Sequence, residues 1–313
     1  MPADGLTRLE AMGRLSEMNT NESLLLLKTY LLEKRPMVDE SYRVYNCLRG
    51  VRFDSVPQAA VLFPEILELL KDSVYKSVVY SFASNMLGRG FVDPSVFNSC
   101  YDLMVSEAET EYEKYRNPPE GDDYFYSNTF YYNTYALQYL KESDRLTKLF
   151  TSVLTDTVYD EKQTAIVYLI KHKKPVDKKA YQKYLDNPYH RNSLYTELEK
   201  INRTDAYPSK LKNQKAFAEG DLYEVLEYDD YYVSKIKFIE ERKAMYEGTL
   251  QRFYIYRVWF DEDNDAGYFA LAGPYPVDGS KFYMSGNLTG YDIEDYDAKK
   301  LNAFFEKAIT TAE

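Results

Sequence analysis

The chain is poor in the residue types that most often mark a catalytic or metal centre. Its 313 residues include only two cysteines, two histidines and one tryptophan. Cys47 and Cys100 cannot form a disulfide framework, and their apolar, helix-like surroundings indicate buried free thiols. His172 lies in a basic run and His190 in a predicted turn, and neither has a cysteine or histidine at metal-ligand spacing. We therefore predict no catalytic, cofactor-binding or metal-binding residue.

The sequence also lacks a long apolar run and an excess of positive charge. Its densest apolar run, residues 24–27, is far shorter than the ~20 residues that span a bilayer. The first five residues show neither the charged segment nor the apolar core of a signal peptide. A net charge of −11 and a pI of about 5.0 disfavour nucleic acid as a partner, because its backbone attracts clustered Lys and Arg.

Motifs that carry known chemistry are missing as well. The sequence contains no nucleophile elbow, phosphate-binding loop or His-Glu-x-x-His zinc motif. Within residues 261–265, Asp occupies every second position, as in a Ca²⁺-binding loop. The glycine and glutamate that an EF-hand requires are missing, so we favour a hairpin turn. A second acidic cluster, residues 292–297, is either a weak Ca²⁺ site or the charged start of a helix, and we favour the helix start.

Tyrosine is abundant, with 33 residues. Its ring offers an apolar plane with one polar tip, which suits helix-packing seams and binding surfaces. Compositional drift is the simpler explanation of the total number of tyrosines, and we favour it for that total. Contiguous tyrosines in a helix point in different directions, however, so some of their rings must be exposed. They form the candidate recognition surface: Tyr124, Tyr126, Tyr131, Tyr132, Tyr228, Tyr231 and Tyr232.

A Val-Asp pair recurs where one apolar helical run ends and another begins, at residues 38–39, 92–93 and 176–177. An acidic side chain at such a position accepts a hydrogen bond from a free amide at the start of a helix. A second pattern relates residues 70–80 to residues 185–195: each has Leu, an Asp or Asn cap, a basic residue and an aliphatic-Tyr pair. Recurring turns of this kind indicate stacked helical hairpins. The predicted turn caps are Asp39, Asp72, Asp93, Asp177 and Asn187.

Residues 64–72, Pro-Glu-Ile-Leu-Glu-Leu-Leu-Lys-Asp, followed by a second helix, resemble the inner turn of HEAT-type helical repeats. The resemblance covers residues 20–201, with Lys76 and Arg191 at the basic position of the turn. Repeat lengths are irregular, and the spacing from acid to base is shorter than the usual pattern. The resemblance implies a curved scaffold used for binding. We recognise no family for the C-terminal module.

The periodicity predicts helices up to about residue 201 and a different module after it. Expected helices include residues 6–17, 42–48, 57–70, 74–87, 146–154, 162–170, 180–185 and 193–201. Residues 252–260 and 267–272 read as strands, and residues 282–288 are another candidate strand. Residues 235–240 and 243–246 are either further strands or the extension of a helix, and Asp297 opens a final helix. The fold class is thus mainly α: an irregular HEAT-like hairpin array followed by a small α+β module, an antiparallel sheet plus a C-terminal helix. The expected domains are a helical repeat domain (1–202), a linker and helix (203–232) and the module (233–313).

These features favour a non-enzymatic scaffold that binds a protein or peptide along the concave helical face. One alternative is a carbohydrate-binding protein that uses the tyrosine clusters. Another is a carboxylate-dependent hydrolase, which needs two carboxyl groups converging in a pocket. Three matches to a bacterial extracytoplasmic O-glycosylation pattern, at residues 54–56, 72–74 and 156–158, favour a periplasmic or surface location over the cytoplasm, with the leader removed and the chain a fragment of a larger protein.

Overall fold

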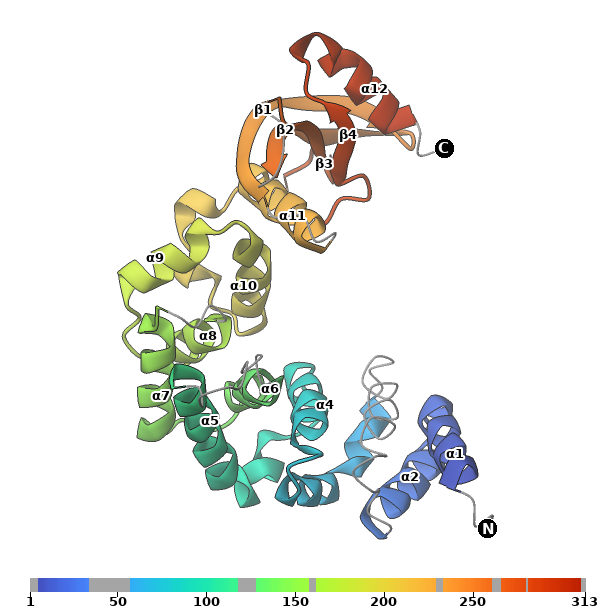
Figure 1. The fold of residues 1–313 in the computed structure, drawn as a ribbon, viewed down its shortest axis with the longest axis vertical. Helices are drawn as coiled ribbons and strands as arrows, with labels where there is room; N and C mark the ends of the chain where they lie inside the picture. Colours follow the sequence, from blue (N-terminus) through green and yellow to red (C-terminus); the bar gives the residue numbers. More distant parts are fainter. Residues whose placement is uncertain are drawn as a thin grey trace. The chain divides into compact units, whose positions relative to one another are not determined.

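The protein folds into two compact units, Met1–Val176 and Asp177–Glu313 (Figure 1). This computed structural model describes residues 5–33, 57–117, 128–157, 162–228, 233–260, 266–279 and 281–310. The first unit is helical, and the second joins helices to a four-stranded antiparallel sheet with a helix after it. The predicted fold class, mainly α with a C-terminal antiparallel sheet and helix, is confirmed. No helix within the described ranges is long and apolar enough to cross a bilayer.

Helix packing builds the first unit. Its elements are α1 (Gly5–Met18), α2 (Asn21–Glu33), η2 (Pro57–Leu62), η3 (Glu65–Lys71), α4 (Lys76–Gly88), η4 (Pro94–Ser99), α5 (Tyr101–Arg116), α6 (Asn128–Leu137), α7 (Asp144–Thr155) and α8 (Gln163–Lys171). The α1 helix packs on α2, α4 and α5 pack on α6, and α7 packs on α8. In α7 the buried residues Leu146, Leu149, Phe150 and Val153 recur at helical spacing, which gives the helix one apolar face.

Residues 57–70 differ from the single helix predicted for them. Proline lacks an amide hydrogen and cannot continue a helical ladder. Two 3₁₀ segments, η2 and η3, lie on either side of Pro64 instead of one α-helix. Both remain buried on one side, through Leu62, Ile66 and Leu70 among others. The apolar pattern therefore predicted the burial of this segment correctly but not its helix type.

The four predicted turn caps that the structure describes lie between helical elements, each with a different partner. Asp93 accepts a hydrogen bond from the Ser95 amide at 2.7 Å at the start of η4. Asp177 accepts from the Ala180 amide at 2.7 Å at the start of α9 (Lys178–Asp186). Asp72 follows η3 and accepts from the Val74 amide at 3.1 Å, and Asn187 accepts from the Tyr189 amide at 3.1 Å. Asp39 and the helix predicted at residues 42–48 lie outside the described residues.

The second unit places a meander sheet between helices. It contains α9, α10 (Tyr189–Lys200), η5 (Thr204–Ala206), η6 (Ser209–Leu211), α11 (Gln214–Tyr228), β1 (Val233–Tyr246), β2 (Thr249–Phe260), β3 (Tyr268–Pro276), β4 (Gly290–Asp295), η7 (Ala298–Lys300) and α12 (Leu301–Thr310). Strand order is β1-β2-β3-β4, with every neighbour antiparallel. The β1–β2 turn uses Glu247 and Gly248, both at positive φ (47° and 74°), as a tight hairpin requires.

Alternation along β2 gives the sheet two apolar faces. Tyr256 and Val258 pack with Leu222 of α11 on one face. Phe253 and Ile255 pack with Phe305 of α12 on the other. Side chains of a strand point alternately to opposite faces, so one strand serves both cores. Figure 1 shows α11 and α12 on opposite sides of the sheet.

Two strand predictions need correction. The candidate strands at 235–240 and 243–246 form one strand, β1, whose register shifts between Phe238 and Glu240. Residues 282–288 were predicted as a strand, but they form a non-strand segment before β4. The reason is that side chains of α11 satisfy this segment's backbone: Gln214 bonds both the amide (2.9 Å) and the carbonyl (2.6 Å) of Tyr283.

The two compact units divide at Val176, before α9, while the boundary near Arg203 stays a prediction. The polar run 203–215 indicated a linker, yet Tyr207 within it is 2% exposed and its ring lies 5.1 Å from that of Tyr195. Helix α10 packs on α11, where Asn192 donates to the carbonyl of Phe217 at 3.0 Å. These contacts place α9 and α10 in the same unit as the sheet.

Candidate functional site

The predicted tyrosine surface lies only partly within the described residues. Tyr124, Tyr126, Tyr231 and Tyr232 lie outside them, and Tyr228 is the last residue of α11. Tyr131 and Tyr132 lie on α6, their ring centroids 5.2 Å apart and nearly perpendicular at 68°. The structure therefore groups two of the seven predicted residues, and it places them in the helical unit.

Further tyrosines extend this surface along one side of α6. Tyr131 is 39% exposed, and its ring is 6.2 Å from that of Tyr135. Tyr139 follows, 5.8 Å from Tyr135 with 69° between the ring planes, and the ammonium of Lys171 lies 5.5 Å from its ring centre. The Tyr131 and Tyr135 rings are 29° from parallel, whereas the Tyr135 and Tyr139 rings meet edge to face.

A groove runs between α5 and α7, and the sequence analysis did not identify it. Two cavities of about 430 and 230 Å³ adjoin there and share Tyr112, Arg116 and Ser152 as lining residues. One wall is a face of α5 and the other a face of α7. We call this feature the α5–α7 groove, lined by Glu109, Tyr112, Glu113 and Arg116 on the first side and Arg145, Lys148, Ser152, Thr155 and Asp156 on the second. The i, i+3, i+4, i+7 spacing of the α5 set was a readable signal of a shared face, but not of a facing helix.

A buried phenol and a carboxylate hold one end of the groove. The hydroxyl of Tyr112 donates to Oδ2 of Asp156 at 2.7 Å, joining α5 to the end of α7. Tyr112 is 4% exposed and its ring stacks 5.9 Å from Phe130. Burial, together with the adjacent Asp156 carboxylate, raises the pKa of the Tyr112 hydroxyl above its usual value. Tyr112 therefore stays protonated and serves as a fixed donor.

An arginine and a glutamate close the other end. Nη2 of Arg145 lies 2.6 Å from Oε2 of Glu109, and its Nε lies 3.2 Å from Oε1. The same Nη2 donates to the Ser106 hydroxyl at 3.0 Å. Paired bonds from a guanidinium to a carboxylate fix geometry as well as charge. The two helices are thus bridged at two places along the groove.

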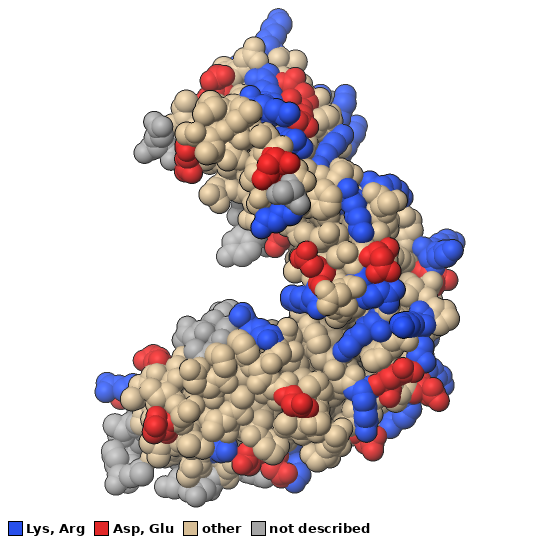
Figure 2. All heavy atoms as spheres, turned by 180° about the vertical axis from the view of Figure 1, so that it is seen from behind, with Lys and Arg blue, Asp and Glu red and all other residues tan. Residues whose placement is uncertain are grey.

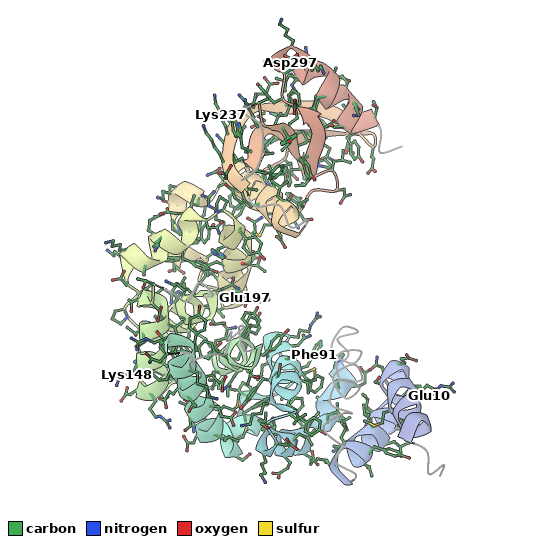
Figure 3. The ribbon with its side chains drawn as sticks, viewed as in Figure 1. Glu10, Phe91, Lys148, Glu197, Lys237 and Asp297 are labelled. Atoms are coloured by element: carbon green, nitrogen blue, oxygen red, sulfur yellow. The ribbon has the colours of Figure 1, made fainter. Side chains whose placement is uncertain are left out.

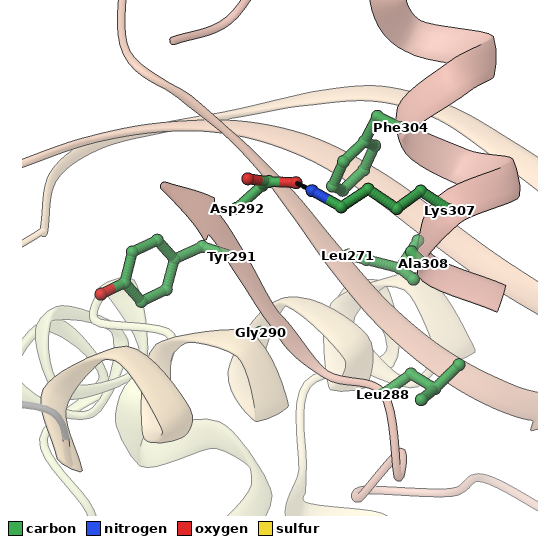
Figure 4. Close-up of a pocket in the computed structure, with 8 residues that line it drawn as sticks. All are labelled: Leu271, Leu288, Gly290, Tyr291, Asp292, Phe304, Lys307 and Ala308. Carbon is green, nitrogen blue, oxygen red and sulfur yellow. Dashed lines mark hydrogen bonds and ion pairs between the residues drawn. The ribbon is translucent and has the colours of Figure 1, made fainter. Parts of the chain in front are cut away.

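A separate cavity of about 350 Å³ lies in the second unit, between α12 and the β3–β4 edge of the sheet (Figure 4). Leu271 of β3 and Phe304 and Ala308 of α12 provide apolar walls. Asp292 and Lys307 point toward each other across it, 3.2 Å apart. This ion pair joins β4 to α12, and that structural role is enough to account for both charged side chains.

The hydrolase hypothesis would need two carboxyl groups in one pocket. The most buried carboxylate in the described ranges with a raised pKa, Asp221 of α11, is 5% exposed and lines none of the three cavities above. Its Oδ2 instead accepts from Tyr275 at 2.5 Å, Thr289 at 2.7 Å and the Gly286 amide at 2.9 Å. Asp221 therefore positions the segment before β4, through its bonds to Gly286 and Thr289. Among the described residues, no group of three or more His, Cys, Asp or Glu side chains could hold a metal ion.

Charge is mixed on the surface seen in Figure 2, where Lys and Arg side chains are interspersed with Asp and Glu. Comparison of the chain with known protein families, curated proteins and solved structures finds no match.

Proposed function

We propose that this protein is a non-enzymatic scaffold of HEAT-like helical hairpins that binds a protein or peptide segment in the α5–α7 groove. The observation that carries the proposal is the pair of adjoining cavities, about 430 and 230 Å³, which share lining residues along two facing helices. Helical repeats expose elongated surfaces of this kind, and such surfaces commonly bind extended partners.

The chemistry of the lining supports a peptide over an apolar ligand. Ser152 supplies a hydroxyl that can donate and accept, and Arg116 supplies several N–H donors. The Thr155 hydroxyl donates to the Thr151 carbonyl at 3.1 Å, so it offers an acceptor. A peptide offers backbone amides and carbonyls at every residue, so it can satisfy such a mixed set. Leu149, 5% exposed, adds only a small apolar contribution.

A peptide-display selection on the purified protein tests the proposal, followed by fluorescence anisotropy with the enriched peptides. Ser152→Trp fills the groove because Ser152 lines both cavities. Thr151→Trp is the matched control, since Thr151 is exposed on the same helix and lines neither cavity. We expect Ser152→Trp to weaken binding by about tenfold or more, roughly 1.4 kcal/mol, and Thr151→Trp to leave it within about twofold. Failure to enrich any peptide, or equal binding by the two variants, would reject the function.

A further inference from the structure

We infer that the hydroxyl of Ser73, in the turn between η3 and α4, is an O-glycosylation site of the folded protein. The inference goes beyond the proposed function and does not depend on the α5–α7 groove. It starts from the three matches to the extracytoplasmic O-glycosylation pattern, which include every Asp-Ser and Asp-Thr pair of the chain. Of the three hydroxyl residues, the structure describes Ser73 and Thr157, and Ser55 lies outside the described residues.

Ser73 is exposed at the centre of a short turn. The Tyr75 amide donates to the Asp72 carbonyl at 3.2 Å, so Ser73 and Val74 are the two central residues of the turn. Tyr75 is 1% exposed and anchors the turn to the core, whereas Ser73 is exposed. A glycan is bulky and can be attached only to a surface residue, and connecting turns are where the backbone is most accessible. Ser73 meets both requirements.

The carboxylate beside this hydroxyl is accessible as well. Asp72 is half-buried, and its Oδ1 accepts from the Val74 amide at 3.1 Å. The basic residue of this turn, Lys76, pairs with Glu107 at 2.6 Å instead of with Asp72. A transferase that offers an N–H donor or a cation can therefore bind Asp72 through a charge-assisted hydrogen bond while it positions Ser73.

The match at Thr157 presents its carboxylate differently. Thr157 is exposed, but the Asp156 side chain is only 8% exposed, and its Oδ2 accepts the Tyr112 hydroxyl at 2.7 Å. An enzyme that binds Asp156 would have to displace Tyr112 and leave a buried hydroxyl without its partner, which is unfavourable. Two copies of one pattern therefore differ in accessibility, and the fold favours Ser73.

The modification transfers a sugar from an activated donor. The Ser73 oxygen forms a bond to the anomeric carbon of a glycosyl phosphate or glycosyl diphosphate, and the bond from that carbon to the phosphate oxygen breaks. The phosphate or diphosphate leaves with the bonding electrons, and the hydroxyl proton passes to a base of the transferase. This protein supplies only the acceptor and the turn that presents it.

Mass spectrometry of the protein, purified from the organism that encodes it, tests the inference. Trypsin cleaves after Lys and Arg, so it separates Ser73, in peptide 72–76, from Thr157, in peptide 149–162. We expect a glycan on the first peptide and none on the second. Ser73→Ala should remove the glycan. Asp72→Asn should also remove it, because it keeps the acceptor oxygen of the turn but loses the negative charge.

Ser95→Ala is the matched control. Ser95 is exposed at the start of η4 and precedes Val96, but Pro94 rather than Asp stands directly before it. The segment follows Phe91, which Figure 3 labels beside α4. Ser95→Ala should retain the glycan of the native protein, because the control serine lacks the adjacent carboxylate.

Circular dichroism of each variant establishes that its helices are intact. An unmodified Ser73 in the native protein would overturn the inference, as would a glycan that persists in Asp72→Asn. Equal modification of Thr157, or a glycan on Ser95, would show that the pattern or exposure alone is enough, and it would overturn the selection of Ser73 by the fold. None of these results bears on peptide binding in the α5–α7 groove.

Discussion

At the scale of single residues, Asp221 is the side chain that organises the segment before β4. One of its oxygens accepts three hydrogen bonds, from Tyr275, Thr289 and the Gly286 amide. A Cβ at Gly286 would lie 2.4 Å from the Gly273 carbonyl oxygen, so only glycine allows this close approach. The segment therefore depends on an acceptor in α11 and on a residue without a side chain.

Removing that acceptor should destabilise the second unit. In Asp221→Ala the buried Tyr275 hydroxyl and two half-buried donors, Gly286 and Thr289, lose their partner. A buried unsatisfied group costs ~1–3 kcal/mol, so we expect a loss of about 2 kcal/mol or more in the free energy of unfolding. Asp221→Asn keeps an acceptor oxygen and should lose less. Denaturant unfolding measures both. Glu224→Ala, an exposed carboxylate on the same helix, should change stability by less than about 0.5 kcal/mol; an equal loss would contradict the role assigned to Asp221.

Asp221 should also make stability depend on pH. Burial raises its pKa in the folded state above 3.8, although its hydrogen bonds act in the opposite direction. Between pH 3.8 and the raised folded-state pKa, the folded protein binds a proton that the unfolded chain releases. Stability therefore falls as pH rises through that window. The native protein should gain stability relative to Asp221→Asn as pH is lowered from neutral toward 3.8. Parallel pH profiles for the two proteins would exclude this effect.

At the scale of elements, the capping signals were the most readable part of the sequence. Asp177 accepts from the Ala180 amide at 2.7 Å at the start of α9. Asp177→Ala should cost ~1 kcal/mol, and Asp177→Ser or Asp177→Asn should restore most of it, because each retains a capping oxygen. The melting temperature of the three variants measures this. An equal fall in melting temperature in all three variants would show that the side-chain oxygen of Asp177 is not what stabilises the helix.

Other elements were harder to predict because their form depends on distant residues. The apolar pattern of residues 57–70 predicted that the segment is buried, but it did not predict the 3₁₀ geometry on either side of Pro64. Likewise, residues 282–288 were a candidate strand, but Gln214 and Asp221 satisfy backbone groups that a neighbouring strand would have paired. Local pattern reports which side chains are apolar, whereas tertiary hydrogen bonding decides where the backbone finds partners.

At the scale of the whole molecule, the order of helices and strands followed from periodicity, but the candidate site did not. The groove needs Tyr112 of α5 beside Asp156 at the end of α7, 44 residues later in the chain. Nothing in the spacing of either helix specifies the other as its neighbour. Tyr131 and Tyr132 were found because tyrosine composition is visible in one stretch of sequence. Surfaces assembled from two helices require the fold.

The boundary between the two units yields the last prediction. A fragment of residues 177–313 should fold alone, because both faces of its sheet are covered from within, by α11 and α12. A fragment of residues 203–313 lacks α10 and loses the Asn192 bond to the Phe217 carbonyl (3.0 Å) and the Arg191–Glu219 ion pair (3.2 Å).

The shorter fragment also exposes Phe217, which is fully buried and packs with Tyr195 of α10 at 4.9 Å between ring centres. A loss of even about 1–2 kcal/mol in the free energy of unfolding lowers the melting temperature of a domain of this size by roughly 5 °C or more. Thermal unfolding followed by far-ultraviolet circular dichroism compares the fragments directly. Equal melting temperatures would mean that α9 and α10 add nothing to the sheet-bearing unit, and that the polar run after Arg203 is the true boundary.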